Sequence, residues 1–248
     1  MKTKHEQNRR VVMIRHAQSE WNRQGRFTGW ADPQLTPAGR AEAIRAGRQL
    51  DLAGYRFDQA FSSRLQRAQD TAQLVLRYSG NSAVPVAEDW RLNERHYGDL
   101  QGRDKERMAG QVGAEQVWRW RRSYAERPPA MAAGDRHHPR QLARWNDIAR
   151  AQLPNGESLA DTRERVMAVW GERIAPCVAE GRRLLIASHG NTLRALLMGL
   201  SGMSVAEVES FEIPTGVPII ASFDPQGQMR DWHYLDESAA RNAHGVAA

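Results

Sequence analysis

Two short apolar runs in this chain each end in a histidine, and this repeated pattern constrains the fold more than any other feature. Residues 11–16 read VVMIRH and residues 184–190 read LLIASHG, and both runs have the composition of buried strands. In open α/β sheets, ligands bind beyond the carboxyl ends of the strands. His16 and His189 are therefore expected to face one pocket. The alternative, that each histidine only caps its strand by hydrogen bonding, stays open at this point.

Strand and helix patterns alternate along the rest of the chain. Apolar runs predict strands at 11–15, 57–62, 84–88, 183–188, 219–223 and 229–234. Start signals and helical periodicity predict helices that begin at Pro37, Arg64, Ser158 and Thr192. Pro176 is expected to end or kink the third of these helices. The alternation predicts an α/β fold, a three-layer sandwich whose mainly parallel central sheet is flanked by helices.

One catalytic unit with a covering insertion is the expected organisation. Residues 1–10 are charged, lack the apolar stretch of a secretory signal, and are expected to form a disordered extension. The catalytic domain is expected over 11–235. A helical and irregular lid is expected within it at about 89–154, with helices near 104–112 and 114–126. Residues 236–248 are expected to be a flexible tail, with a part in closing the site as the alternative.

The charge of the chain favours a small anionic substrate over a polynucleotide. The 248 residues carry 35 Lys and Arg against 29 Asp and Glu, and the basic residues are spread along the chain, not clustered.

No apolar window is long enough to span a membrane, and the single cysteine, Cys177, favours a cytoplasmic setting. The metal-binding pattern HExxH and the phosphate-loop pattern GxxxxGK[ST] are both missing, so arginine and histidine would have to handle a phosphate alone.

Several longer motifs resemble those of the cofactor-dependent phosphoglycerate mutases of the histidine phosphatase superfamily. The resemblance begins with RHAQSEWN at 15–22 and FTGW at 27–30. It continues, in family order, through SSRLQRAQDTA at 62–72, WRLNERHYGDLQG at 90–102, VWRWRRSY at 117–124, PNGESLADT at 154–162, ASHGNTLRAL at 187–196 and IPTGVP at 213–218. It covers about residues 11–235. The motif at 90–102 and the Arg121–Arg122 pair are typical of the mutases and not of generic phosphatases in the superfamily.

The resemblance implies a role for each matching residue. His16 is implied as the phosphorylated nucleophile and Glu94 as the general acid and base, with Arg15, Arg67 and His189 as the clamp around the phosphoryl group. Further phosphate-pocket positions are Ser19, Asn22, Gly190 and Asn191. Positions that hold the other phosphate or the carboxylate are Thr28, Gly29, Arg95, Tyr97, Lys105, Arg121 and Arg122. Such chemistry needs a neutral imidazole to attack phosphorus and fixed cations to offset the negative charge on the phosphoryl oxygens. It also needs a carboxylate that can hold a proton.

The implied activity is interconversion of 3-phosphoglycerate and 2-phosphoglycerate in glycolysis and gluconeogenesis. The resemblance implies 2,3-bisphosphoglycerate as the primer of phospho-His16, no metal, no nucleic-acid or membrane partner, and a homodimer or homotetramer. A phosphatase or a bisphosphoglycerate synthase using the same site is the alternative within enzymes. A non-catalytic scaffold or nucleic-acid binder is disfavoured because all five catalytic positions are present.

One departure from the family pattern lies beside the nucleophile. Ala17 stands where the family usually has glycine. If this position needs a positive φ, alanine costs about 1 kcal/mol and displaces His16. If φ is negative, the substitution is harmless.

Overall fold

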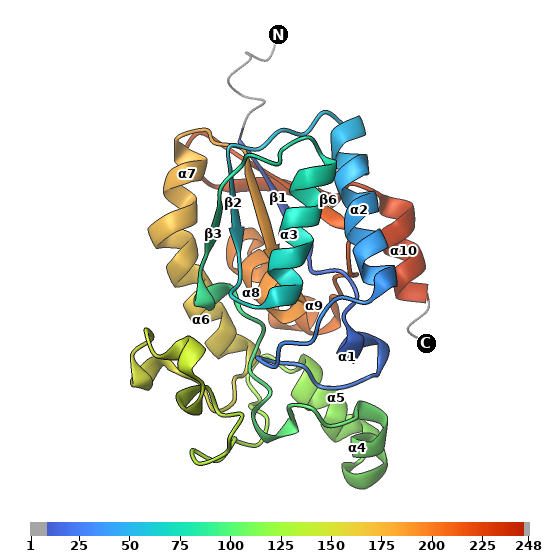
Figure 1. The fold of residues 1–248 in the computed structure, drawn as a ribbon, viewed down its shortest axis with the longest axis vertical. Helices are drawn as coiled ribbons and strands as arrows, with labels where there is room; N and C mark the ends of the chain where they lie inside the picture. The colour runs from blue at the N-terminus through green and yellow to red at the C-terminus, as the bar shows by residue number, and fades with distance from the viewer. Residues whose placement is uncertain (1–8, 246–248) are drawn as a thin grey trace.

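Six strands form one sheet through the centre of the molecule (Figure 1), and the computed structural model describes residues 9–245. The sheet has the order β3-β2-β4-β1-β5-β6. Its strands are β1 (Arg10–Arg15), β2 (Gln59–Ser62), β3 (Val86–Glu88), β4 (Leu184–Ser188), β5 (Pro218–Phe223) and β6 (Met229–Tyr234). Among these strands β5 alone runs against the others, since it pairs antiparallel with both β1 and β6. The expected α/β class with a mainly parallel sheet is confirmed.

The two apolar runs that end in histidine lie side by side in this sheet. Strands β1 and β4 pair in parallel, with Arg15 opposite Ser188. The backbone N–H of His16 donates to the carbonyl of Ser188 at 2.8 Å, so the pairing continues one residue past β1. His16 and His189 therefore leave the sheet at the same edge, as the sequence predicts.

Helices cover both faces of the sheet, which gives three layers (Figure 1). Val12 and Ile14 of β1 are buried in a cluster with residues of α2 (Pro37–Leu52) and α3 (Gln66–Tyr78). Val11 and Met13 point the other way, into a cluster with residues of α6 (Leu159–Val169), α7 (Ala175–Ala179) and α8 (Gly190–Ser201). Successive strand residues point to opposite faces, so β1 contributes to both cores.

Local signals set the helix boundaries. Thr36 caps α2 by accepting from the backbone N–H of Gly39 at 2.9 Å, with Pro37 in the first turn. Ser158 opens α6 with a capping box. The long helix expected from Ser158 is interrupted by a π-helical turn at Trp170–Ile174 directly before α7. Pro176 explains this break, because it has no N–H to continue the helical hydrogen bonding.

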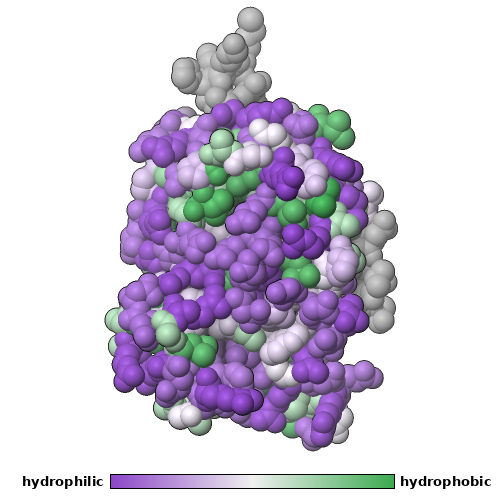
Figure 2. Space-filling view, in the orientation of Figure 1, coloured by the Kyte–Doolittle hydropathy of each residue, from purple (hydrophilic) through white to green (hydrophobic). Residues whose placement is uncertain are grey.

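The polar insertion lies beyond the carboxyl ends of the parallel strands. It contains α4 (Lys105–Val112), α5 (Ala114–Arg122) and several short 3-10 turns, below the sheet in Figure 1. Its outer surface on the face shown in Figure 2 is mainly hydrophilic. Inside, Trp145 is almost fully buried in an apolar cluster with Trp30 and Leu65, so the insertion is packed onto the body of the protein.

The ends of the domain differ from expectation. Residues 1–8 and 246–248 lie outside the described residues, but Arg10 already belongs to β1 and is not part of an extension. The expected flexible tail is wrong over 237–245, which forms helix α10 (Glu237–Gly245) beside α2 (Figure 1). Ala240 of this helix is buried, and Gln49 of α2 donates to Asp236 at 3.0 Å. Helix α10 therefore packs on the body and does not cover the site.

Among residues 9–245, three α-helices have no counterpart among the expected elements: α1 (Glu20–Arg23), α9 (Val205–Ser210) and α10. The first two are a few residues long, too short for a periodic apolar pattern. Within residues 9–245, no helix combines the length and apolar character needed to cross a membrane.

Replacing Gly98 tests how tightly the insertion is packed. Gly98 has φ +56°, and a Cβ there would lie 2.0 Å from the carbonyl oxygen of Pro129. Gly98→Ala is expected to lower the free energy of unfolding by well over 1 kcal/mol, the approximate cost of a positive φ alone. The control is Gly54→Ala, where φ is +75° and no atom lies within 4 Å of the added Cβ. Equal losses for the two variants in urea denaturation would contradict the packing at Gly98.

Candidate active site

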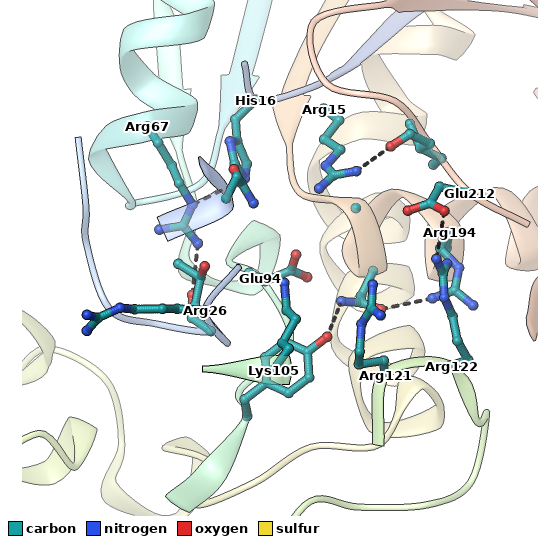
Figure 3. A pocket seen from close by; sticks show the side chains of 17 residues that line it. Arg15, His16, Arg26, Arg67, Glu94, Lys105, Arg121, Arg122, Arg194 and Glu212 are labelled. Carbon is teal, nitrogen blue, oxygen red and sulfur yellow. Dashed lines mark hydrogen bonds and ion pairs between the residues drawn. The ribbon is translucent and has the colours of Figure 1, made fainter. Parts of the chain in front are cut away.

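A pocket lies between the carboxyl ends of the strands and the insertion (Figure 3). It brings together thirteen of the sixteen residues predicted for the site: Arg15, His16, Asn22, Thr28, Gly29, Arg67, Glu94, Tyr97, Lys105, Arg121, Arg122, Gly190 and Asn191. The other three do not line it. Ser19 caps α1 and bonds Asn22, while Arg95 and His189 are fully buried and contact lining residues.

His16 is held with one ring nitrogen ready to act as a nucleophile. Its Nδ1 lies 2.8 Å from the carbonyl oxygen of Ala17, which can only accept, so Nδ1 carries the proton. The lone pair is then on Nε2, where it accepts a hydrogen bond from Arg67 Nε at 3.3 Å. Burial and the nearby charges of Arg67 and Arg15 hold the pKa of His16 well below its usual range. His16 is therefore a neutral imidazole in this site.

Arg67 is a buried cation fixed by backbone carbonyls. Its Nη1 donates to Ala31 at 2.7 Å and its Nη2 to Gly29 at 2.8 Å. Burial lowers the pKa of Arg67 to about 10, so it stays charged at neutral pH. Because the side chain is fully buried, this charge acts on His16 with little solvent screening.

Arg15 lines the pocket beside His16, at the end that we call the near end, and His189 contacts His16 from outside the pocket lining. Arg15 donates from Nη1 to the carbonyl of Ile213 at 2.6 Å and packs against Gly190, the first residue of α8. His189 Nε2 lies 2.8 Å from Ser63 Oγ, and its ring meets that of His16 with centroids 5.0 Å apart. Among the described residues, His189 Nδ1 and Arg15 Nε have no hydrogen-bond partner. Two guanidinium groups and the N-terminus of α8 thus surround one anion-sized space.

The Glu94 carboxylate lies between the two ends of the pocket (Figure 3). Its Oε1 accepts from the backbone N–H of Arg95 at 2.8 Å, and its carbonyl accepts from Trp30 Nε1 and Arg165. An ion pair with a neighbouring arginine is the alternative explanation for this residue. Arg91 pairs with Asp89 and Glu172 instead, which leaves the Glu94 carboxylate directed at the pocket.

A buried ion pair holds the segment that carries Glu94. Arg165 of α6 pairs with Glu157 at 2.6 Å and donates to the carbonyls of Arg91 and Asn93. Glu157 in turn accepts from the backbone N–H of His96 at 2.7 Å. This pair satisfies backbone groups on both sides of Glu94 and fixes the loop without any regular structure.

The far end of the pocket is built by the insertion. Lys105 comes from α4, and Arg121 and Arg122 come from the last turn of α5. Tyr97 receives a hydrogen bond from Arg95 Nη2 at 3.1 Å. Burial opposes ionisation of Tyr97, but the charge and hydrogen bond of Arg95, together with the charge of Lys105, outweigh it and lower the pKa to about 8. The pocket therefore has a second cationic region facing the first across Glu94.

Four lining residues were not predicted: Arg26, Arg194, Glu212 and Ile213. Arg194 follows Gly190 by four residues in α8, so helical spacing from the predicted Gly190 was a usable signal. Arg26 falls between two recognised motifs and Glu212 immediately precedes a third, but neither position carries a local signal of its own.

Ala17 fits without strain. No non-glycine residue among 9–245 has a positive φ, so the glycine-requiring case does not apply. The side chain is fully buried with Leu35 and Ala43, and its N–H donates to Thr71 Oγ1 at 3.1 Å. The alanine therefore adds core packing beside the nucleophile.

A buried neutral histidine between arginines, facing a carboxylate, defines a phosphoryl-transfer site. Residues 11–136 and 131–234 match the model of the histidine phosphatase superfamily, branch 1. This match covers most of the chain, and the chain belongs to this superfamily.

Solved structures of phosphatases share the fold. A mycobacterial glucosyl-3-phosphoglycerate phosphatase, in complex with VO3, is 25% identical, with a TM-score of 0.66 over 91% of this chain and 96% of that one. A putative alpha-ribazole-5'-P phosphatase from Escherichia coli is 26% identical, with a TM-score of 0.65 over 92% and 96%. The alpha-ribazole phosphatase from Shigella flexneri is 27% identical, with a TM-score of 0.62 over 89% and 93%.

The protonation of His16 can be read by 15N NMR. At pH 6.5 about half of an ordinary histidine is charged. His16 is expected to be neutral there, with the proton on Nδ1, because burial and two arginines lower its pKa. His16→Asn identifies the signal. An imidazolium with both nitrogens protonated at pH 6.5 would contradict the assigned geometry.

Proposed function

We propose that this protein is a 2,3-bisphosphoglycerate-dependent phosphoglycerate mutase that interconverts 3-phosphoglycerate and 2-phosphoglycerate through phospho-His16. The observation that carries the proposal is the two-ended pocket, with His16 at one end, insertion cations at the other, and Glu94 between them. A phosphoglycerate has the matching form, with a phosphate and a carboxylate on a three-carbon chain. Its charge near neutral pH is about −2.5 to −3, counting the phosphate and the carboxylate.

The first chemical step is attack of His16 Nε2 on phosphorus. A bond forms between Nε2 and phosphorus while the bond to the substrate oxygen breaks. Arg67, Arg15 and the first amides of α8 offset the charge on the equatorial oxygens. Glu94 gives a proton to the departing oxygen and later takes one from the hydroxyl that attacks phospho-His16. One carboxylate therefore serves both directions.

The donor set also fits a bisphosphate primer. When bound, 2,3-bisphosphoglycerate supplies the phosphoryl group that loads His16. Arg15 and Arg67 would hold the phosphate that is transferred, and Lys105, Arg121 and Arg122 would hold the other anionic groups. Arg15, which lines the pocket, has an unpartnered buried Nε, and a phosphoryl group would offer the missing acceptor. The insertion that supplies the far end also limits access of water to phospho-His16.

A phosphatase using the same residues is the second candidate. It is favoured by the activities that the similar structures are named for, one of which is a glucosyl-3-phosphoglycerate phosphatase. In that case water, activated by Glu94, replaces the substrate hydroxyl as acceptor. The far-end cations would then position a different group of a phosphomonoester.

Phosphorus NMR of one reaction separates the two candidates. The protein is mixed with 3-phosphoglycerate and a metal chelator, with and without 2,3-bisphosphoglycerate, and both 2-phosphoglycerate and inorganic phosphate are followed. The proposal expects fast formation of 2-phosphoglycerate that depends on the bisphosphate and survives chelation. Release of inorganic phosphate at an equal or higher rate would overturn the mutase assignment in favour of the phosphatase.

Glu94→Gln tests the proton-transfer step. The variant keeps the size and the bond from the N–H of Arg95 but cannot hold the proton. The rate of interconversion is expected to fall by about 10²- to 10⁴-fold, the usual contribution of a general acid or base. Glu180→Gln, in a surface ion pair with Arg182, is the matched control and should keep full activity. A loss below tenfold for Glu94→Gln would exclude it from this role.

A further inference from the structure

Glu212 is an acidic residue in a pocket built for anions. Among the described residues, seven cationic side chains and two carboxylates line this pocket, and the second carboxylate after Glu94 belongs to Glu212. It lies at the far end with Arg122 and Arg194, on the segment between α9 and β5 (Figure 3). A carboxylate there opposes the binding of a further negative charge, and the mechanism above does not use it.

The Glu212 carboxylate forms an ion pair with Arg122. Its Oε2 lies 2.8 Å from Arg122 Nη2, and Arg122 Nη1 donates to the carbonyl of Phe211 at 3.3 Å. The guanidinium is thus directed at the 211–212 segment. Although partial burial of Glu212 opposes ionisation, the charge and hydrogen bond of Arg122, with the charges of Arg15 and Arg121, together outweigh it and lower the pKa, so the carboxylate is charged at neutral pH. A ligand that reaches Arg122 must displace this carboxylate or share the cation with it.

The backbone holds Glu212 firmly in this place. Its carbonyl accepts from the Tyr234 hydroxyl at 3.2 Å, and the next carbonyl, of Ile213, accepts from Arg15 at 2.6 Å. The same short segment therefore touches a cation at each end of the pocket. Displacing the carboxylate has to occur by side-chain rotation, because the backbone is tied to β6 and to the near-end clamp.

We propose that Glu212 is a specificity-determining residue that weakens binding of a second phosphate at the far end of the pocket relative to a carboxylate. The inference rests on the proposed function for the identity of the two ligands. The repulsion from Glu212 grows with the charge of the far-end group, which is about −1.5 to −2 for a phosphate and about −1 for a carboxylate. Removing the Glu212 charge should therefore favour the bisphosphate over the monophosphate.

Isothermal titration calorimetry of Glu212→Gln measures this preference. The His16→Ala variant is compared with the double variant that also carries Glu212→Gln, so that no phosphoryl group is transferred during titration. The probes are inorganic phosphate, 3-phosphoglycerate and 2,3-bisphosphoglycerate. Removal of the Glu212 charge is expected to raise the affinity for 2,3-bisphosphoglycerate about tenfold and that for 3-phosphoglycerate about threefold or less. The affinity for inorganic phosphate is expected to change hardly at all.

Glu172→Gln is the matched control, because it removes one carboxylate from an arginine ion pair outside the pocket. It changes the net charge equally and should leave all three affinities unchanged. Equal tightening of the three ligands by Glu212→Gln, no tightening, or the same effect from Glu172→Gln would overturn the inference. The interconversion assay tests the proposed function separately. A graded shift in affinity without any interconversion would support the charge selection while contradicting the mutase.

Discussion

The parallel pairing of β1 with β4 places two histidines and one arginine at the same edge of the sheet, and every other part of the site is built around them. Arg15 and His16 follow β1, and His189 follows β4, directly before the N-terminus of α8. Arg67 reaches the same point from α3. Since β4 and most of β1 are buried, the positions of these side chains are set by the packed centre of the sheet. The opposite end is supplied by helices α4 and α5 of the insertion.

Burial gives these residues their chemical properties. An exposed imidazole would be partly charged near neutral pH, whereas His16, enclosed beside Arg67 and Arg15, is held neutral, which is the form that the proposed attack on phosphorus needs. The same arginines concentrate positive charge in a small space, which the phosphoryl group of the proposed substrate would offset. At the far end, where Arg122 pairs with Glu212, the positive charge is already partly neutralised.

Sequence patterns predicted the sheet and most of the site, because both depend on local signals. Apolar runs identified the strands, and the family resemblance, followed along all of its motifs, identified thirteen lining residues. The remaining features depend on tertiary packing. Glu212 enters the pocket only because β6 and Arg15 hold its segment, and α10 is a helix against α2 although its sequence has the polarity of a tail. Such short segments carry no periodic apolar pattern that predicts where they pack.

A single-turnover experiment shows whether His16 is the nucleophile. The protein is mixed with 2,3-bisphosphoglycerate labelled on phosphorus, quenched in base to preserve acid-labile phosphohistidine, and analysed by peptide mass spectrometry, with and without 3-phosphoglycerate. We expect label on His16, none in His16→Ala, and discharge by 3-phosphoglycerate faster than by water. Label on another residue, or label undiminished in His16→Ala, would contradict the assignment of His16 as the nucleophile.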